Sequence, residues 1–245
     1  MVLIVLYLSG MESILEISLR KVIYVSVACF IPIKANSERV PGKNFRVLNG
    51  KKLYQYICES IKAADSFDKV YVDTNSDEIA VYAKSMGFEV IIRKPELALN
   101  TANGNDLLVY HYLTHSEYDF YFQVFATAPY LKAETIKKCV NKLIYSEKYD
   151  SCFTALEKHG FYWFEGHPIN YRPDILPRSQ DLPPVIEETT GLYGISKDSL
   201  EKYRCRIGKN PYIYCVSQYE AVDINTEEDF SYAEHVGRLL GDDFL

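Results

Sequence analysis

The sequence lacks the features that usually mark metal-binding, disulfide-bonded and membrane-spanning proteins. Its six cysteines are scattered, with no Cys-x-x-Cys pair and no metal-ligand spacing, which favours reduced core residues in a cytosolic protein. The apolar run at residues 1–8 is too short to cross a bilayer and lacks the basic lead of a secretory signal. We therefore expect a cytoplasmic protein without a membrane segment.

An excess of positive charge is also missing. The chain has 27 lysines and arginines against 33 acidic residues, a net charge of −6. A nucleic-acid-binding protein would need a basic face, so this balance favours a small anionic ligand held by a local cluster of cations. The 245 residues, 48% of them hydrophobic, suffice for one α/β enzyme domain with a large core.

What the chain does have is a strand that runs directly into a loop rich in cations. Residues 22–33 are almost wholly apolar and β-branched, which is typical of a strand buried on both faces. Lys34, Arg39 and Lys43 follow in one loop, and a triphosphate at the carboxyl end of a parallel strand would explain them. A solvated basic turn is the alternative, but the tight Pro-Gly turn before Lys43 should aim that side chain back at the strand.

Small residues between these cations have backbone N–H groups that can approach an anion; they are Ala35, Asn36 and Ser37. The loop is nevertheless neither of the common phosphate-binding loops. The chain contains no Gly-x-x-x-x-Gly-Lys-Ser/Thr loop and no Gly-x-Gly-x-x-Gly fingerprint.

The loop resembles the first signature of the acylneuraminate and 3-deoxy-octulosonate cytidylyltransferases, which runs Pro-x-Arg-x-x-Ser-x-x-x-Pro-x-Lys-Asn. Ser37, Lys43 and Asn44 match this pattern, and Lys34 takes the place of its arginine. Glu38 departs from it, because sialic acid enzymes usually have lysine there. The arginine that follows is closer to the octulosonate branch of the family.

The remaining chain alternates strand and helix patterns, which predicts a mainly parallel sheet covered by helices on both faces. We expect strands at 22–33, 69–73, 88–92, 120–125 and 151–156 and helices at 53–64, 79–86, 105–115 and 133–146. Together with the resemblance, this implies an α/β protein with a Rossmann-like nucleotidyltransferase fold. Residues 21–245 would form a single cytidylyltransferase domain, and residues 1–20 an extension with either Met1 or Met11 as the natural start.

Residues 157–188 break this alternation. The segment is rich in proline and aromatic residues, has no clear period, and is too long for an ordinary connection in a compact domain. We expect an insertion that binds substrate, forms a homodimer, or does both. Its aromatic cluster (Phe161, Tyr162, Trp163, Phe164) suits a dimer interface, although it could equally cover the domain's own core.

Two further segments resemble the family around the nucleotide. Residues 72–80 are similar to its Val-Ser-Thr-Asp-Ser-x-x-Ile-Ala turn. Arg93 and Thr101 lie in a copy of its Arg-Pro-x-Glu-Leu-Ala-x-Asp-Thr-Ala run, with Asn100 in place of the aspartate. The resemblance implies that Arg93, Thr101 and Asn103 border the nucleotide, whereas a purely structural reading has Arg93 capping a strand end.

The residues that resemble the family's sugar-binding motifs begin at the expected central strand. Gln123 stands near a Thr-Ala-Pro sequence where the family has Gln-Pro-Thr-Ser-Pro-Leu-Arg, and a primary amide can donate to and accept from sugar hydroxyls. Glu188 and Thr190 lie where the family has a Glu-Asn-Gly-Ala-x-Tyr strand. All three are therefore expected sugar-binding residues.

Arg178 and Gln180 fall in a copy of the family's Arg-x-Gln-Asp-Leu-Pro-Pro element. Since an arginine can hold a carboxylate through two hydrogen bonds, Arg178 is the expected reader of a sugar acid's carboxylate, with Arg172 a weaker candidate. The alternative is a surface arginine that pairs with a neighbouring aspartate.

Asp223 and Asn225 resemble the Asp-x-Asp pair of the family's Asp-Ile-Asp-Thr-x-x-Asp sequence. Alternate residues of an extended segment point the same way, so both could face one Mg²⁺, which prefers oxygen ligands. The asparagine keeps an oxygen but removes a charge. Thr226 and Asp229 have the spacing of a capping box and are expected to start a helix.

The resemblance implies cytidylyl transfer from CTP to the anomeric hydroxyl of a 3-deoxy-2-keto sugar acid, with release of pyrophosphate. The acid would be an octulosonate or a nonulosonate such as N-acetylneuraminate, legionaminate or pseudaminate. Lys34, Arg39 and Lys43, with Mg²⁺, would stabilise charge on the phosphoryl oxygens in the transition state. No residue stands out as a general base.

Two alternatives stay open. The first is a nucleotidyltransferase for another base or sugar, because the loop reads phosphates and says little about cytosine. The second is a catalytically weak, nucleotide-binding homologue with a regulatory role, which Glu38, Asn100 and Asn225 support. His111 and His115 are one helical turn apart, but no third ligand accompanies them, so we expect ordinary helix residues.

Overall fold

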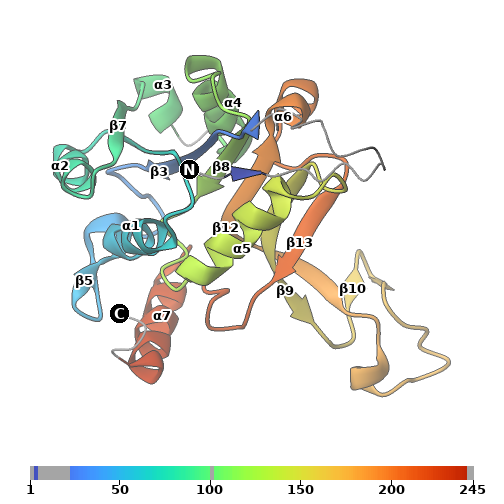
Figure 1. The fold of residues 1–245 in the computed structure, drawn as a ribbon. Helices are drawn as coiled ribbons and strands as arrows, with labels where there is room; N and C mark the ends of the chain where they lie inside the picture. The colour runs from blue at the N-terminus through green and yellow to red at the C-terminus, as the bar shows by residue number, and fades with distance from the viewer. Residues whose placement is uncertain (1–2, 5–22, 100–101, 242–245) are drawn as a thin grey trace, which may run out of the picture.

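Seven strands form a central sheet with helices on both faces (Figure 1). The computed structural model describes residues 3–4, 23–99 and 102–241. The order across the sheet is β13-β9-β12-β8-β3-β6-β7. These strands span Val27–Ile33 (β3), Lys69–Thr74 (β6), Glu89–Ile92 (β7), Phe120–Val124 (β8), Ser151–Lys158 (β9), Val185–Ser196 (β12) and Pro211–Cys215 (β13).

The sheet is mainly parallel, as the sequence predicted. Strands β8, β3, β6 and β7 all run the same way, and β13 is parallel to β9. Only β12 among these strands runs against its neighbours, β8 and β9. The four consecutive parallel strands therefore place their carboxyl ends along one edge, where ligands of such sheets bind.

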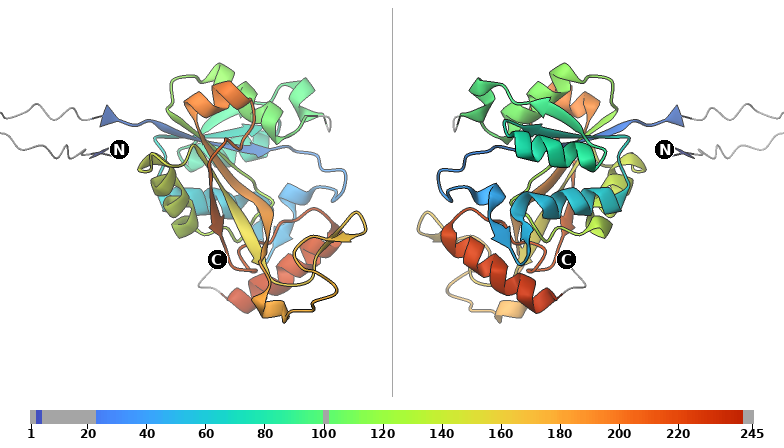
Figure 2. Two further views of the ribbon diagram at one scale, coloured as in Figure 1. Left: turned by 90° about the vertical axis from the view of Figure 1, so that its right-hand side faces the viewer. Right: turned by 90° about the vertical axis from the view of Figure 1, so that its left-hand side faces the viewer.

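The helices are divided between the two faces of the sheet (Figure 2). Phe30 of β3 belongs to the same hydrophobic cluster as Leu108, whereas its neighbour Ile31 clusters with Ile57 on the other face, as the alternation of strand side chains requires. The helices are α1 (Leu53–Ala64), α2 (Asp77–Ser85), α3 (Pro95–Ala98), α4 (Gly104–Thr114), α5 (Ala133–Ile144), α6 (Lys197–Tyr203) and α7 (Glu227–Leu240). The four predicted helices agree with α1, α2, α4 and α5 to within two residues at each end.

The first predicted strand is wrong at its start. The sheet strand begins at Val27, and Ile23–Tyr24 (β2) instead pairs with Leu3–Ile4 (β1). The carboxylates of Asp119 and Asp68 accept from the backbone N–H groups of Ser26 and Val27, which ends the ladder at this point. Apart from β1, the predicted extension at 1–20 lies outside the described residues.

The predicted irregular insertion at 157–188 is shorter than expected, because β9 and β12 extend into it as an antiparallel pair. A register shift between Glu188 and Tyr193, with Thr190 at a φ of 52°, breaks the alternation that would reveal β12 in the sequence. Residues 159–184, here called the ribbon tip, project from the body in Figure 1. They contain β10 (Trp163–Phe164), β11 (His167–Pro168) and the 3₁₀ turn η2 (Ser179–Asp181).

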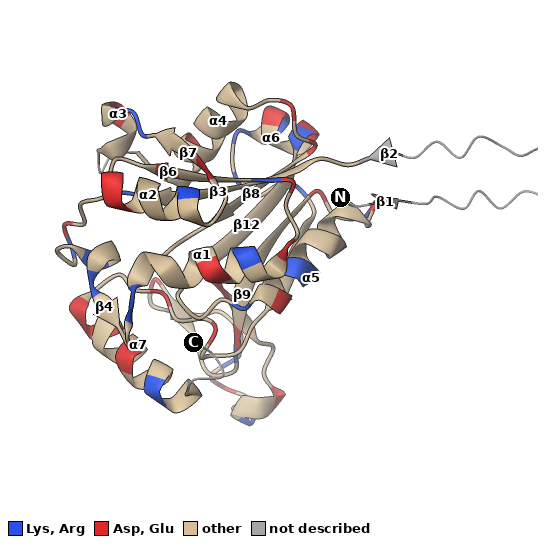
Figure 3. Ribbon diagram, turned by 60° about the vertical axis from the view of Figure 1, so that its left-hand side comes forward, with Lys and Arg blue, Asp and Glu red and all other residues tan. Residues whose placement is uncertain are grey.

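A second small layer joins the cation-rich loop to the C-terminal helix. The loop leads into η1 (Lys43–Phe45), β4 (Val47–Leu48) and β5 (Lys51–Lys52). Leu48 and Tyr130 share a cluster with Phe230 of α7. Helices α1, α5 and α7 carry residues of both signs (Figure 3), and no described helix is long and apolar enough to span a membrane.

All six cysteines lie in the described residues and are free. Four are buried, as predicted for core residues, but Cys205 is half-buried and Cys215 is exposed.

Candidate active site

A cavity of about 470 Å³ opens beyond the carboxyl ends of β3, β7 and β8. Residues from the loop after β3, from the end of β7 and from the turn after β8 line it together. The predicted site residues among them are Lys34, Ser37, Arg39, Lys43, Asn44 and Arg93, and the acidic Glu38 joins them. The structure thus brings the predicted cations to one concave surface, at the edge where a parallel sheet binds ligands.

The cation-rich loop is fixed from within and from the C-terminal segment. Asn44 Nδ2 donates to the carbonyl of Lys34 at 2.8 Å, and Lys43 Nζ donates to the carbonyl of Ile224 at 2.5 Å. Gly42, with a φ of 62°, provides the left-handed turn that aims Lys43 inward. Arg39 Nη2 donates to Asn225 Oδ1 at 2.8 Å.

Burial lowers the pKa of Lys43, and the nearby carboxylate of Asp223 only partly opposes this shift, while the Arg39 cation adds to it. The cavity is lined by four cations, Lys34, Arg39, Lys43 and Arg93, and by one carboxylate, Glu38. A bound polyphosphate would supply the missing negative charge.

Arg93 is held by a buried network that the sequence did not reveal. Its Nε donates to Asp73 Oδ1 at 2.9 Å, and its Nη2 donates to the backbone carbonyl of the same residue at 2.9 Å. His111 Nε2 lies 2.9 Å from the other carboxylate oxygen, and the ring of Phe30 stacks on the imidazole at 4.6 Å. Arg93 therefore fastens the ends of two strands and also faces the cavity.

Burial and the neighbouring charges together set the pKa values of Asp73 and His111 in this network. Desolvation alone would raise the pKa of Asp73, but the hydrogen bond from His111 and the charge of Arg93 outweigh it and lower that pKa. Desolvation lowers the pKa of His111, more than Asp73 raises it. The neutral imidazole donates through Nε2 to an ionised Asp73, which leaves Nδ1 buried and without a partner in the part of the chain that the structure describes. His111 is therefore not an ordinary helix residue, and the sequence interpretation is corrected here.

Three of the predicted sugar residues, Gln123, Glu188 and Thr190, lie at the end of β8 and in the middle of β12. Gln123 is fully buried, and its Nε2 donates to the carbonyl of Gly104 at 3.0 Å. Glu188 accepts from the hydroxyl of Tyr193 at 2.6 Å, and Thr190 donates to Asp223 Oδ2 at 2.7 Å. Glu188 also lines a second cavity of about 430 Å³ together with the residues predicted to bind a metal.

Asp223 and Asn225 lie side by side, as their spacing predicted, and Asn225 Nδ2 donates to Asp223 Oδ2. Asp223 Oδ1 is buried and has no hydrogen-bond partner among the described residues, which leaves one carboxylate oxygen without a bond. Among the residues that the structure describes, no group of three His, Cys, Asp or Glu side chains is placed to hold a metal. These donors fit an ion such as Mg²⁺ that keeps waters and substrate phosphates as its other ligands, and they do not fit an all-protein site.

Other predicted nucleotide residues have different surroundings. The backbone N–H of Ala35 already donates to Asn75 Oδ1 at 2.7 Å, and Asn36 is exposed. Asn103 caps α4 by accepting from two backbone N–H groups of its first turn. Thr101 lies outside the described residues. The capping box of Thr226 and Asp229 at the start of α7 is confirmed.

Arg178 and Gln180 lie on the ribbon tip, and neither lines the two cavities described above. The Arg178 side chain is 73% exposed and pairs with Asp181 at 2.7 Å. Arg172 pairs with Asp174 at 2.6 Å in the same way. The pairing with a neighbouring aspartate that the sequence allowed is thus present for both.

One cation near the sugar residues was missed by the sequence. Arg206, between α6 and β13, lies over the ring of Tyr193 at 3.7 Å. Nothing in its local sequence distinguishes it from the exposed basic residues around it, because only the fold brings it to β12.

A family model described as cytidylyltransferase matches residues 28–237. The chain is 28% identical over 216 residues to N-acylneuraminate cytidylyltransferase A of Danio rerio, covering 85% of this chain and 50% of that protein. It is 25% identical over 228 residues to an N-acylneuraminate cytidylyltransferase of Streptococcus agalactiae serotype V, covering 87% and 53%. The chain thus spans about half the length of the curated relatives it matches.

Solved structures share the fold. A CMP:2-keto-3-deoxy-manno-octonic acid synthetase complexed with CTP superposes with a TM-score of 0.63 at 16% identity, covering 89% of this chain and 99% of that one. A 4-diphosphocytidyl-2C-methyl-D-erythritol synthase from Anaerococcus prevotii gives 0.60 at 13% identity, covering 86% and 95%. At these identities the likeness confirms the predicted fold class and no more.

Proposed function

The chain belongs to the cytidylyltransferase family, and we propose that it transfers a cytidylyl group from CTP to the anomeric hydroxyl of a 3-deoxy-2-keto sugar acid. The observation that carries this proposal is the set of cations from two separate segments, the loop after β3 and the end of β7, lining one cavity at the carboxyl edge of the sheet. The names of the curated relatives support an acidic sugar as the acceptor.

In the proposed reaction the sugar hydroxyl attacks the α-phosphorus of CTP. A new O–P bond forms, the bond to the β-phosphate oxygen breaks, pyrophosphate leaves, and the hydroxyl proton passes to solvent. Lys34, Arg39 and Lys43 act on the phosphoryl oxygens, where negative charge accumulates as pyrophosphate departs. Because Asn44, Ile224 and Asn225 hold parts of this loop in place, its cations need little rearrangement before they act.

We propose that Asp223 and Asn225 hold a Mg²⁺, which when bound would neutralise phosphate charge. Asp223 is the stronger ligand, since its Oδ1 is unpartnered and Thr190 orients its other oxygen. Asn225 Oδ1 now accepts from Arg39, so a metal there would release this guanidinium toward the phosphates.

The proposal is tested by pyrophosphate release with CTP and Mg²⁺ across N-acetylneuraminate, legionaminate, pseudaminate and 3-deoxy-octulosonate. We expect release with at least one acid, and a loss of about 100-fold or more in kcat for Lys43→Met, the size of effect seen when one positioned donor to a developing oxyanion is removed. Lys84→Met, which removes an exposed lysine of α2, is the matched control.

Two other outcomes would count against this proposal. CTP binding without release of pyrophosphate would favour the nucleotide-binding subunit that Glu38 and Asn225 suggest. Release with UTP or ATP in place of CTP would favour a nucleotidyltransferase for another base.

We also propose a homodimer formed through the ribbon tip. This segment exposes an unusual number of large apolar side chains, namely Phe161, Trp163, Phe164, Ile169, Ile175 and Leu176. Light scattering should give twice the chain mass for the wild type and the single mass for Trp163→Glu. Leu239→Glu, at an exposed apolar position of α7, should stay dimeric. A monomeric wild type would contradict this proposal.

A further inference from the structure

Arg206 lies in a half-buried position between two aromatic rings. Its guanidinium carbon is 3.7 Å from the ring centre of Tyr193 and 5.9 Å from that of Phe125, which itself lines the cavity beyond β8. The Tyr193 ring is almost fully buried in the body of the protein. A guanidinium stacked on a fixed ring keeps its plane while its N–H edge stays available for a ligand.

That edge has one long ion pair, with Glu188, and no hydrogen bond in the part of the chain that the structure describes. Among the described residues, none accepts a hydrogen bond from the guanidinium of Arg206. The nearest recorded carboxylate oxygen, Glu188 Oε2, is 3.9 Å from Nη2 and already accepts from the hydroxyl of Tyr193. The side chain is only 24% exposed, so water reaches these donors from a restricted side.

A buried acceptor without a partner lies next to these donors. Gln123 Oε1 has no hydrogen bond among the described residues, although Nε2 of the same amide is satisfied by Gly104. Arg206 Nη1 lies 2.8 Å and Gln123 Oε1 3.3 Å from the point that a Cβ on Gly104 would occupy. The Arg206 guanidinium and the Gln123 carbonyl oxygen, neither of them in a hydrogen bond among the described residues, therefore lie on two sides of the place where Gly104 has no side chain.

We propose that Arg206 binds the carboxylate of the sugar acid, while Gln123 Oε1 accepts from a hydroxyl beside it. The inference rests on the proposed function and names the residue that selects an acid over a neutral sugar. A cyclic 2-keto sugar acid carries a carboxylate and a hydroxyl on the same carbon, which matches one donor fork and one acceptor across this space. Arg206 thereby takes the role that the sequence suggested for Arg178.

The test compares each acid with its own methyl ester, which keeps the hydroxyls and removes the charge. Of the four acids named above, the one with the highest turnover is used, and KM is measured for acid and ester at saturating CTP. Hydrogen bonds to a charged group discriminate by roughly 10-fold to 100-fold, so the wild type should prefer the acid by at least about 10-fold. Arg206→Met should bring the two KM values to within about threefold of each other, as expected when that hydrogen bond is lost.

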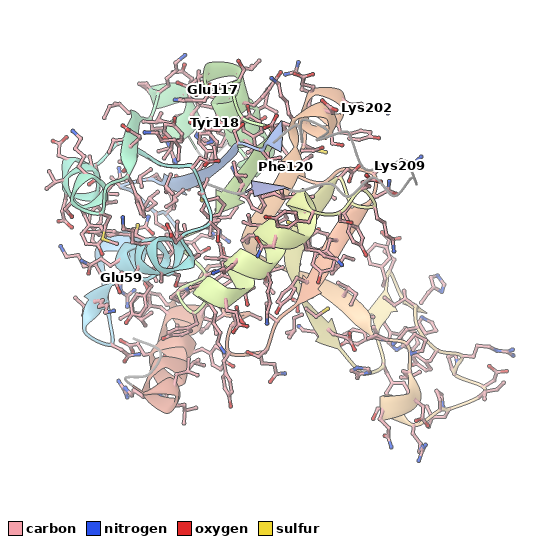
Figure 4. All side chains as sticks on the ribbon, in the orientation of Figure 1. Glu59, Glu117, Tyr118, Phe120, Lys202 and Lys209 are labelled. Atoms are coloured by element: carbon pink, nitrogen blue, oxygen red, sulfur yellow. The ribbon has the colours of Figure 1, made fainter. Side chains whose placement is uncertain are left out.

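Three variants serve as comparisons. Lys209→Met removes an exposed charge from the same loop, at the edge of the molecule in Figure 4, and should keep the preference. Arg206→Lys should restore part of it. Gly104→Ala keeps the arginine in the sequence but puts a methyl group against its Nη1, so the guanidinium must shift. This variant should raise KM for the acid more than for the ester. CTP affinity should be unchanged in all of them, which also shows that they fold.

An unchanged preference for the acid in Arg206→Met would overturn the inference while leaving the proposed function intact. The same holds if Arg178→Met abolishes the preference instead. An equal loss for acid and ester in Arg206→Met would make Arg206 a structural residue and would also overturn it. If the wild type releases pyrophosphate with none of the acids, the proposed function itself fails.

Discussion

Arg93 and Arg178 were both assigned to substrate from the same resemblance, yet the fold gives them opposite settings. The Arg93 side chain is 3% exposed and shares Asp73 with His111, whereas the Arg178 side chain is 73% exposed and pairs with Asp181. A guanidinium held by several buried bonds presents one geometry to a ligand. An exposed pair exchanges with water and must be ordered by whatever binds it.

The contrast extends to the two parts of the molecule that carry these arginines. The edge of the parallel sheet builds a cavity from segments far apart in sequence, and two of its cations, Lys43 and Arg93, are buried and hydrogen-bonded. The ribbon tip has large exposed apolar groups and ion pairs between near neighbours. We interpret the first as a preorganised nucleotide site and the second as a surface that acquires its function in an assembly.

The largest expected difference between Arg93 and Arg178 is in the free energy of unfolding that is lost when each is replaced. Arg93→Met leaves Asp73 buried with one partner fewer and should lower the free energy of unfolding by about 3–5 kcal/mol. Arg178→Met should change it by less than about 1 kcal/mol. Urea unfolding measures both, and similar losses for the two variants would break the comparison.

The next largest effect is expected at Asp223 and Asn225, the pair proposed to hold Mg²⁺. Asn225→Asp adds a second carboxylate beside Asp223 and should lower the Mg²⁺ concentration for half-maximal activity by about tenfold, since ligand charge sets affinity. Without metal the two carboxylates repel, so the variant should melt at a lower temperature and recover on adding Mg²⁺. Asn141→Asp on the exposed face of α5 is the control. An unchanged Mg²⁺ requirement would argue against a metal at this pair.

Acidification should act on the Arg93 network through His111. The pKa of His111 lies below its ordinary value of 6.5 in the folded protein, mainly through burial. As the pH falls below about 6.5, the unfolded chain takes up this proton before the folded one, and stability is lost until the folded pKa is reached. His111→Gln keeps a donor for Asp73 but does not titrate, and should flatten the loss between pH 7 and 5.

His235→Gln, at an exposed histidine of α7, is the matched control for that experiment. It should leave the pH dependence of the melting temperature as in the wild type. If both variants show the wild-type slope, His111 does not carry the effect.

The smallest expected effect is at the other surface arginine of the ribbon tip. Arg172→Met removes an exposed pair with Asp174 and should change the free energy of unfolding by less than about 1 kcal/mol at low salt, and by less still at high salt. A loss above 2 kcal/mol would mean that the ribbon is more tightly organised than its exposure indicates.

The sequence could predict contacts between residues close together in the chain. It could not predict contacts that depend on how separate strands and helices are placed. The cations of the loop are neighbours along the chain, so their meeting at one cavity followed from a strand and a turn. Asp73 meets Arg93 across 20 residues and His111 across 38, through two strands and a helix whose relative placement no local pattern specifies.

The same limit explains which of the proposed sugar-binding residues could be predicted from the sequence. Gln123 was predicted because it matches the family's glutamine at the end of the central strand and its amide can bind sugar hydroxyls. A strand near Glu188 and Thr190 was expected only from the resemblance, because the bulge of β12 near Thr190 breaks its alternation, and the surroundings of Arg206 could not be predicted from it. Arg178 was favoured because its motif is recognisable in the sequence, although the motif alone does not show where its side chain lies.

The most direct test of this account is the affinity for CTP, measured by calorimetry with Mg²⁺ and no sugar. We expect one site per chain, the same affinity in Arg178→Met, and an affinity at least about tenfold weaker in Lys43→Met, since a hydrogen bond to a charged group is lost. No binding of CTP, or binding that depends on Arg178 and is indifferent to Lys43, would contradict a nucleotide site built at the edge of the sheet.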